Sequence, residues 1–156
     1  QFEKFDANLQ LDPANPETAR VTATIDMSSL SIPNPPDGFV AELLGENWLG
    51  ANITPQATFT STSVKLTGPA TADILGDFTL KGVTKPVTFK ATFNGGYEGH
   101  VQDPNARIGF SAKGAIKRSD FGITIGIPAE GSTMGVFDDV AFEIEAEFSG
   151  PPLAPA

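Results

Sequence analysis

The chain has 156 residues, 40% of them hydrophobic, and a formal net charge of −9 at neutral pH. This length is enough for one domain with a core of its own. The acidic balance argues against nucleic-acid binding, which needs clustered Lys and Arg, and against an anionic membrane surface. Cysteine is absent, so disulfides, thiolate metal sites and a cysteine nucleophile are excluded.

Apolar and polar residues alternate with period two in five segments, as they do in strands with one buried face. These segments start at Phe5, Val21, Val87, Ile108 and Val140. Two less regular strands are expected at 57–66 and 71–80. Together with turns rich in Gly and Pro, the seven strands predict an all-β fold with an antiparallel sheet curled into a barrel. One further strand before Gln1 would make eight, the size at which a closed barrel holds one small ligand.

The segment 31–55 departs from this pattern. Its first part is a stiff arm rich in Pro, and from Phe39 to Trp48 apolar residues recur at close to helical spacing, which predicts a single short helix. Asp37 is expected to cap this helix. The barrel domain is expected to cover 1–149, and a Pro-rich tail follows at 150–156.

Two segments carry a specific resemblance. Residues 76–89 show the pattern of a strand, a tight corner from Gly82 to Pro86 and a second strand. Residues 110–123 show a strand that ends in a charged turn closing on Phe121 and Gly122. Together, in this order, these segments resemble the YceI family of bacterial lipid-binding proteins. The resemblance implies a lipocalin-like barrel that binds polyisoprenoid chains in its interior and is exported to the periplasm.

The resemblance also bears on the beginning of the chain. It implies that an earlier strand, and the start of the present first strand, precede Gln1, about 25–30 residues in all. Without that strand the barrel has two open edges with unpaired backbone groups. We expect a partner copy, a swapped segment or preceding residues to pair with these edges.

The inward faces of the strands are the main candidate site. The chain has 12 Phe but one Trp and one Tyr, a lining that suits a hydrocarbon chain and equally suits a filled core. Small residues at Ala91, Ala112 and Gly114 argue for empty room, and the resemblance favours a tunnel. The helix would cover its opening, with Leu44 and Trp48 near the mouth. The expected lining is Ile25, Met27, Leu44, Trp48, Phe59, Phe89, Phe93, Ile108, Phe110, Phe142 and Ile144.

The sequence thus predicts a carrier or storage protein for a long apolar lipid: a polyisoprenoid, a quinone tail or a fatty acyl chain. Burial of ten CH₂-sized groups contributes about 8 kcal/mol, before ordering costs, at about 0.8 kcal/mol each. No cofactor or metal is expected. The expected partner is the lipid and not nucleic acid, and both a homodimer and a membrane-protein partner are left open.

Two other functions remain open. One is a hydrolase whose ester or lactone substrate buries its acyl tail in the barrel, with polar groups from His100, Asp103, Ser119 and Asp120. The other is a quinone-binding domain of a cytochrome b561-type assembly, to parts of which YceI-like domains are similar.

The charged residues of the corner also have two interpretations. Lys85 or Arg118 could meet the head group of a ligand. In the favoured interpretation the role is structural: Arg118 pairs with a carboxylate, and Asp120 caps the turn through its backbone amides. Asp138 and Asp139, with Glu130, could attract Ca²⁺, but a solvated acidic turn is the favoured interpretation because the ordered spacing of a calcium loop is absent.

Overall fold

The computed structural model describes residues 1–12, 14–97, 106–132 and 134–150. Seven strands form one antiparallel sheet in which each strand pairs with the next along the chain. This confirms the all-β, antiparallel architecture. The strands are β1 (Phe5–Gln10), β2 (Arg20–Asp26), β3 (Gln56–Gly68), β4 (Thr71–Leu80), β5 (Val83–Tyr97), β6 (Ala106–Lys117) and β7 (Asp139–Gly150).

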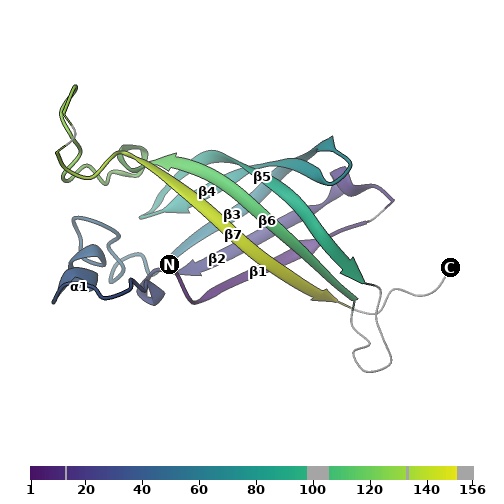
Figure 1. Ribbon diagram of the computed structural model, residues 1–156, viewed down its shortest axis with the longest axis horizontal. Coiled ribbons are helices and arrows are strands. Elements are labelled where there is room, and N and C mark those ends of the chain that lie inside the picture. The colour runs from purple at the N-terminus through teal and green to yellow at the C-terminus, as the bar shows by residue number, and fades with distance from the viewer. Residues whose placement is uncertain (13, 98–105, 133, 151–156) are drawn as a thin grey trace.

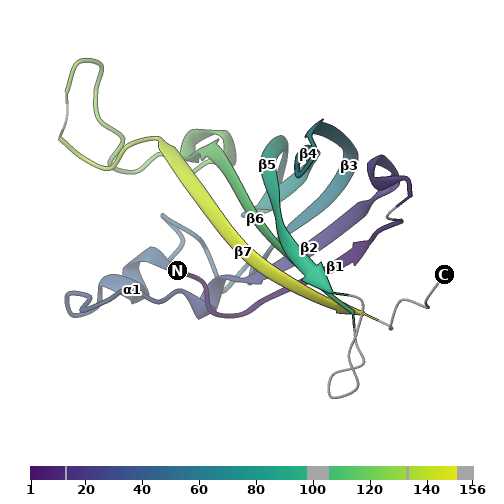
Figure 2. The ribbon, with the colours of Figure 1, turned by 45° about the vertical axis from the view of Figure 1, so that its right-hand side comes forward.

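The sheet rolls into a nearly closed barrel. Figures 1 and 2 show β7 crossing the sheet at the side where β1 and β2 run. Among the described residues, β1 and β7 are the two ends of the strand order and do not pair with each other. The expectation that both edges find a partner therefore stays a prediction.

The turn between β4 and β5 lies earlier than the sequence predicts. Lys81 and Gly82 both have positive φ, 54° and 78°, as the two central residues of a type I′ hairpin turn do. The corner is therefore Lys81–Gly82 and not Gly82–Pro86. Val83 already belongs to β5, and Pro86 stands inside the strand, opposite Asp77 of β4.

The helix is also shorter than predicted. α1 spans only Phe39–Leu43, so Trp48 lies in the turns that follow it. The predicted Asp37 cap is wrong, because Gly38 occupies the N-cap position at φ 75° and no side chain caps the helix. Three short 3-10 turns were not predicted: η1 (Pro16–Thr18), η2 (Met27–Ser29) and η3 (Arg118–Phe121). Within the described ranges, no helix has the length and apolar character needed to cross a membrane.

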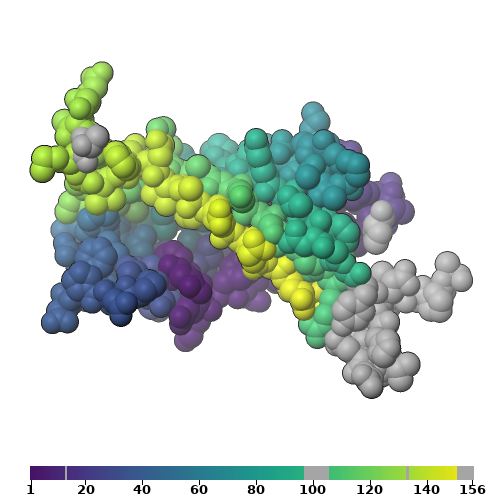
Figure 3. All heavy atoms as spheres, viewed as in Figure 1, coloured from purple at the N-terminus to yellow at the C-terminus, as the bar shows by residue number. Residues whose placement is uncertain are grey.

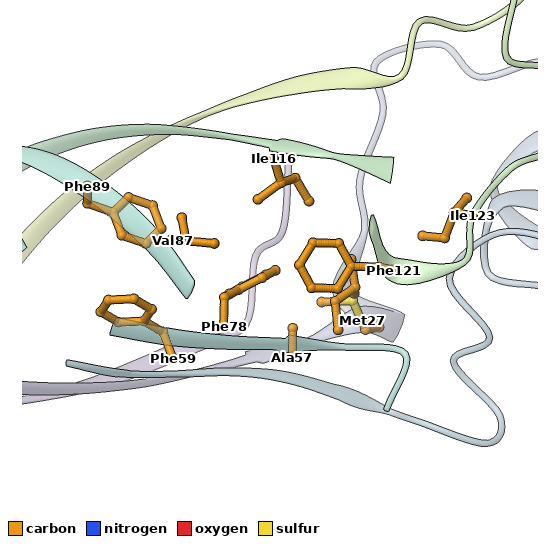
Figure 4. Close-up of a cluster of buried hydrophobic side chains, with 10 residues drawn as sticks. Met27, Ala57, Phe59, Phe78, Val87, Phe89, Ile116, Phe121 and Ile123 are labelled. Atoms are coloured by element: carbon orange, nitrogen blue, oxygen red, sulfur yellow. The ribbon is translucent and has the colours of Figure 1, made fainter. Parts of the chain in front are cut away.

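The packed core fills the half of the barrel next to η2 and η3 (Figure 4). The rings of Phe59 and Phe89 meet edge to face at 5.0 Å between centroids, and those of Phe78 and Phe121 at 5.6 Å. The buried cluster consists of Met27, Ala57, Phe59, Phe78, Leu80, Val87, Phe89, Ile116, Phe121 and Ile123.

Glycine makes room for two of these rings. A Cβ at Gly114 would lie 2.8 Å from Cδ1 of Phe89, and one at Gly76 would lie 2.5 Å from Cζ of Phe59. In the sequence, Gly114 as a small inward residue indicates empty space in the barrel. That interpretation is wrong, because the ring of Phe89 occupies the space.

Ion pairs join the outer faces of β6 and β7. Lys117 Nζ lies 3.0 Å from Asp139 Oδ1, and Lys113 Nζ lies 3.7 Å from Glu143 Oε1. A third ion pair joins Arg107 and Glu147. Between it and the other two, Ser111 Oγ donates a hydrogen bond to the Glu145 carboxylate at 2.6 Å. These groups are exposed, so solvent screens the ion pairs and each contributes little to stability.

Candidate functional site

The inner face of the barrel carries a second aromatic group in the half away from the packed core. Phe93 of β5, Phe110 of β6 and Phe148 of β7 lie side by side, with centroids 5.8 Å and 6.1 Å apart. We call these three residues the aromatic row. Phe93 shares the inward face of Phe89 but is 45% exposed, whereas Phe89 is 6% exposed. Phe93 therefore lies on the inward face of β5 with nearly half of its surface open to solvent.

A strip of small residues separates the aromatic row from the packed core. Ala72 of β4 pairs with Ala91 of β5, and Ala91 pairs with Ala112 of β6. Ala91 is buried, and Ala112 packs against the core. Because the side chain of alanine is a single methyl group, the strip adds little bulk between the two groups of rings. Figure 3 shows the outer surface of the same barrel, where β7 runs diagonally across the front.

The eleven residues of the expected lining do not form one continuous surface. Met27, Phe59 and Phe89 belong to the packed core, and Ile25, Trp48, Phe142 and Ile144 pack against it. Phe93, Ile108 and Phe110 lie in the other half. Leu44 follows α1, where its carbonyl accepts from the Ala51 amide at 2.9 Å. The role of the eleven in binding stays a prediction.

The expected lining does not include Phe148, although this residue belongs to the row. The alternation of β7 was a sufficient signal, because Phe148 shares its face with Phe142 and Ile144. The sequence places Phe121 in a charged turn, yet its side chain is 1% exposed and belongs to the core.

Arg118 is a buried link between the elements that close the α1 end of the barrel. Its side chain donates to three backbone carbonyls: Nη1 to Val136 at 2.8 Å and to Phe137 at 3.3 Å, and Nη2 to Ile125. Its guanidinium also stacks on the ring of Trp48, with Cζ 4.7 Å from the centroid. The expected pairing of Arg118 with a carboxylate is therefore wrong, because main-chain oxygens and an aromatic face take that place.

Asp138 makes the contact that the sequence assigned to Asp120. The Ser119 amide and hydroxyl each donate to the Asp138 carboxylate at 2.7 Å. The hydrogen bonds from the Ser119 side chain and then its backbone hold the pKa of Asp138 below its ordinary value, with smaller contributions from Lys117 and Arg118. The cap of the η3 turn thus comes from the residue directly before β7, 19 residues after Ser119.

The structure describes two of the four residues proposed for a hydrolase, the sequence neighbours Ser119 and Asp120. His100 and Asp103 lie outside the described residues. The Ser119 hydroxyl is engaged by Asp138, and Asp120 borders a hollow of about 250 Å³ next to Lys85 and Phe121. In the ranges described here, no three His, Cys, Asp or Glu side chains gather as metal ligands would.

Known proteins resemble the chain over most of its length. The family model of the YceI-like domain matches residues 1–148. A UPF0312 protein of Pseudomonas putida is 42% identical over 122 residues, which are 78% of this chain and 62% of that protein. A UPF0312 protein of Pseudomonas savastanoi pv. phaseolicola is 36% identical over 143 residues, which are 91% of this chain and 70% of that protein.

Two solved structures share the fold. The crystallised YceI protein of Campylobacter jejuni superposes with a TM-score of 0.81 at 27% identity, covering 96% of this chain and 83% of that one. BcnA of Burkholderia cenocepacia superposes with a TM-score of 0.78 at 26% identity, covering 94% and 85%. The chain spans less than two thirds of the Pseudomonas putida relative's length. With the barrel, the paired motifs and the match over residues 1–148, the chain belongs to the YceI-like domain family.

Proposed function

We propose that this protein binds one long apolar chain along the inner face of its barrel and carries or stores it. The chain would be a polyisoprenoid, a quinone tail or a fatty acyl chain. The aromatic row is the observation on which this proposal rests. Phe93 faces the interior but is 45% exposed, and a filled core would have buried it.

The residues of this half suit a hydrocarbon. The aromatic row and the alanine strip present rings and methyl groups to the interior, and neither offers a side-chain hydrogen bond. Ten buried CH₂-sized groups would contribute about 8 kcal/mol before ordering costs. Because contacts of this kind depend on buried area, binding would discriminate weakly among isoprenoid, quinone and acyl tails.

The packed core limits the length of the site. Phe59 and Phe89 are in contact and nearly fully buried, so they close the inner space beyond the alanine strip. A chain would therefore first occupy the half that holds the aromatic row. Of the expected lining, Phe93, Ile108 and Phe110 would touch it first.

A paired substitution tests the proposal. Phe93→Ala should weaken binding of a fluorescent long-chain fatty acid about tenfold, which corresponds to about 1.4 kcal/mol. Leu75→Ala is the matched control, because Leu75 is 40% exposed and lies on the outer face of β4, opposite Ser63. It should leave the affinity unchanged.

Two results would contradict the proposal. One is a parent protein that neither takes up the fatty acid nor yields a co-purified lipid on native mass spectrometry and solvent extraction. The other is equal binding by the parent protein and the Phe93→Ala variant.

We also infer that the protein acts in the periplasm, as the family resemblance implies. Fractionation of cells that express the full-length gene would test this, and recovery in the cytoplasmic fraction would contradict it.

A further inference from the structure

Two buried nitrogen donors at the α1 end of the barrel have no acceptor. They are Nε1 of Trp48 and Nε of Arg118, and both are shielded from solvent. Arg118 as a whole is only 5% exposed. A buried donor without a partner costs about 1–3 kcal/mol, and most buried polar groups in proteins have one. These two donors therefore need an oxygen that the described part of the chain does not supply.

The guanidinium also lacks a direct negative partner in the described residues. Its other nitrogens donate to carbonyls of Ile125, Val136 and Phe137, which are neutral dipoles. The charge of Arg118 helps to lower the pKa of Asp138, but the Asp138 carboxylate already accepts two hydrogen bonds from Ser119. An acceptor with negative charge would gain more here than a neutral one, because a buried cation without a paired anion is unfavourable.

The two donors belong to one stacked pair. Cζ of Arg118 lies 4.7 Å from the centre of the Trp48 ring. Trp48 packs against the core cluster, which also contains Phe121 of η3. The pair therefore lies at the core end of the barrel interior, opposite the aromatic row.

We propose that Trp48 and Arg118 form the subsite for the oxygen-bearing end of the bound chain. The ligand group would be a carboxylate, a phosphate or a strongly polarised carbonyl oxygen. This inference rests on the proposed function and adds the orientation of the bound chain in the barrel. The polar end points toward α1, and the apolar tail lies on the aromatic row.

A chain that reaches from the aromatic row to Trp48 must pass the contact between Phe59 and Phe89 and displace part of the core. Met27 is the side chain best suited to move, because it is 3% exposed, lies in the cluster with Phe121, and has an unbranched, flexible side chain. Binding should therefore repack the surroundings of Trp48.

The position of the ligand can be read from fluorescence, because Trp48 is the one Trp of the chain. Bromine quenches indole emission at short range, so two brominated acids report which end is near. We expect 2-bromohexadecanoic acid, which carries bromine beside the carboxylate, to quench Trp48 strongly. The matched 16-bromohexadecanoic acid, with bromine at the tail end, should quench it weakly. Equal quenching, or the reverse order, would overturn the subsite.

Trp48→Phe tests the donor itself, because it keeps an aromatic face for Arg118 but removes Nε1–H. We expect its affinity for hexadecanoic acid to fall about tenfold, the effect of one lost hydrogen bond to a charged group. Its affinity for 1-hexadecene, presented in cyclodextrin, should stay unchanged. A thermal melt of the variant checks that the barrel is intact.

The outcomes separate the two proposals. If the parent protein binds neither acid nor alkene, the carrier function fails. If it binds both and Trp48→Phe leaves the preference for the acid unchanged, the subsite fails and the carrier function stands. A variant with lower stability but the same preference would assign the donors to a structural water, which also overturns the subsite.

Discussion

Replacing Gly114 with Ala tests whether the inner half next to α1 is filled. The added Cβ would lie 2.8 Å from Cδ1 and 3.0 Å from Cε1 of Phe89, and 3.4 Å from the Thr88 carbonyl oxygen. Phe89 has little room to move away from the added methyl group, because its ring already contacts the ring of Phe59 edge to face. Overpacking of this kind costs about 1–3 kcal/mol. For a domain of this size, that lowers the melting temperature by about 2–4 °C per kcal/mol.

Gly109→Ala is the matched control on the same strand. Its Cβ would have nothing nearer than 3.9 Å, so only the backbone effect of losing a glycine remains. That effect is about 0.4–1 kcal/mol and stabilising where the conformation suits Ala. Urea unfolding followed by Trp48 emission gives the free energy of unfolding of both variants.

A second substitution separates the ring contact from other causes. In the background of Phe89→Leu, Gly114→Ala should cost less, because the smaller side chain leaves room for the methyl group. If Gly114→Ala and Gly109→Ala have equal stability, or if Phe89→Leu gives no relief, the inner half is not packed as described and the limit on ligand length is lost.

Two further predictions concern the η3 turn. Asp138→Asn should be less stable than the parent protein at neutral pH. Because the folded state lowers the pKa of Asp138 below 3.8, its contribution is present above that value and is lost as pH falls through the folded-state pKa. Denaturant titrations at several pH values should show the two proteins converging in acid, and a difference that persists there would contradict the assignment. Arg118→Lys should lower the melting temperature, since an ammonium cannot span three carbonyls and lie flat on Trp48; hydrogen bonds to charged groups contribute about 1.5–3 kcal/mol each. An unchanged melting temperature would show that the link is dispensable.

The strands could be predicted from the sequence because one face of each is apolar. The period-two pattern of β7 places Val140, Phe142 and Ile144 inward, and the structure agrees. What alternation cannot give is how full the interior is. Phe89 and Phe93 have the same place in the alternating pattern. Phe89 is buried because its ring packs on Phe59 and over Gly114, whereas Phe93 remains exposed.

The errors at the site arise from contacts that are distant in the sequence. The sequence predicts an ion pair for Arg118. Its acceptors are instead main-chain carbonyls, and residue types do not reveal where these lie. Asp138 caps the η3 turn across a long loop, and no local pattern distinguishes it from Asp120. Trp48 was expected on a helix because helical spacing continued past Leu43, but the helix stops there and the chain turns.

The charged pairs between β6 and β7 carry information that the hydrophobic pattern lacks. A slip of two residues between these strands would keep every apolar side chain facing inward, so burial alone distinguishes such a slip poorly. In the observed register Lys117 stands opposite Asp139 and Lys113 opposite Glu143. A slip of two residues in either direction would place Ala141 or Phe137 opposite Lys117. The two ion pairs of the outer face therefore favour the observed register of the last strand over its neighbours.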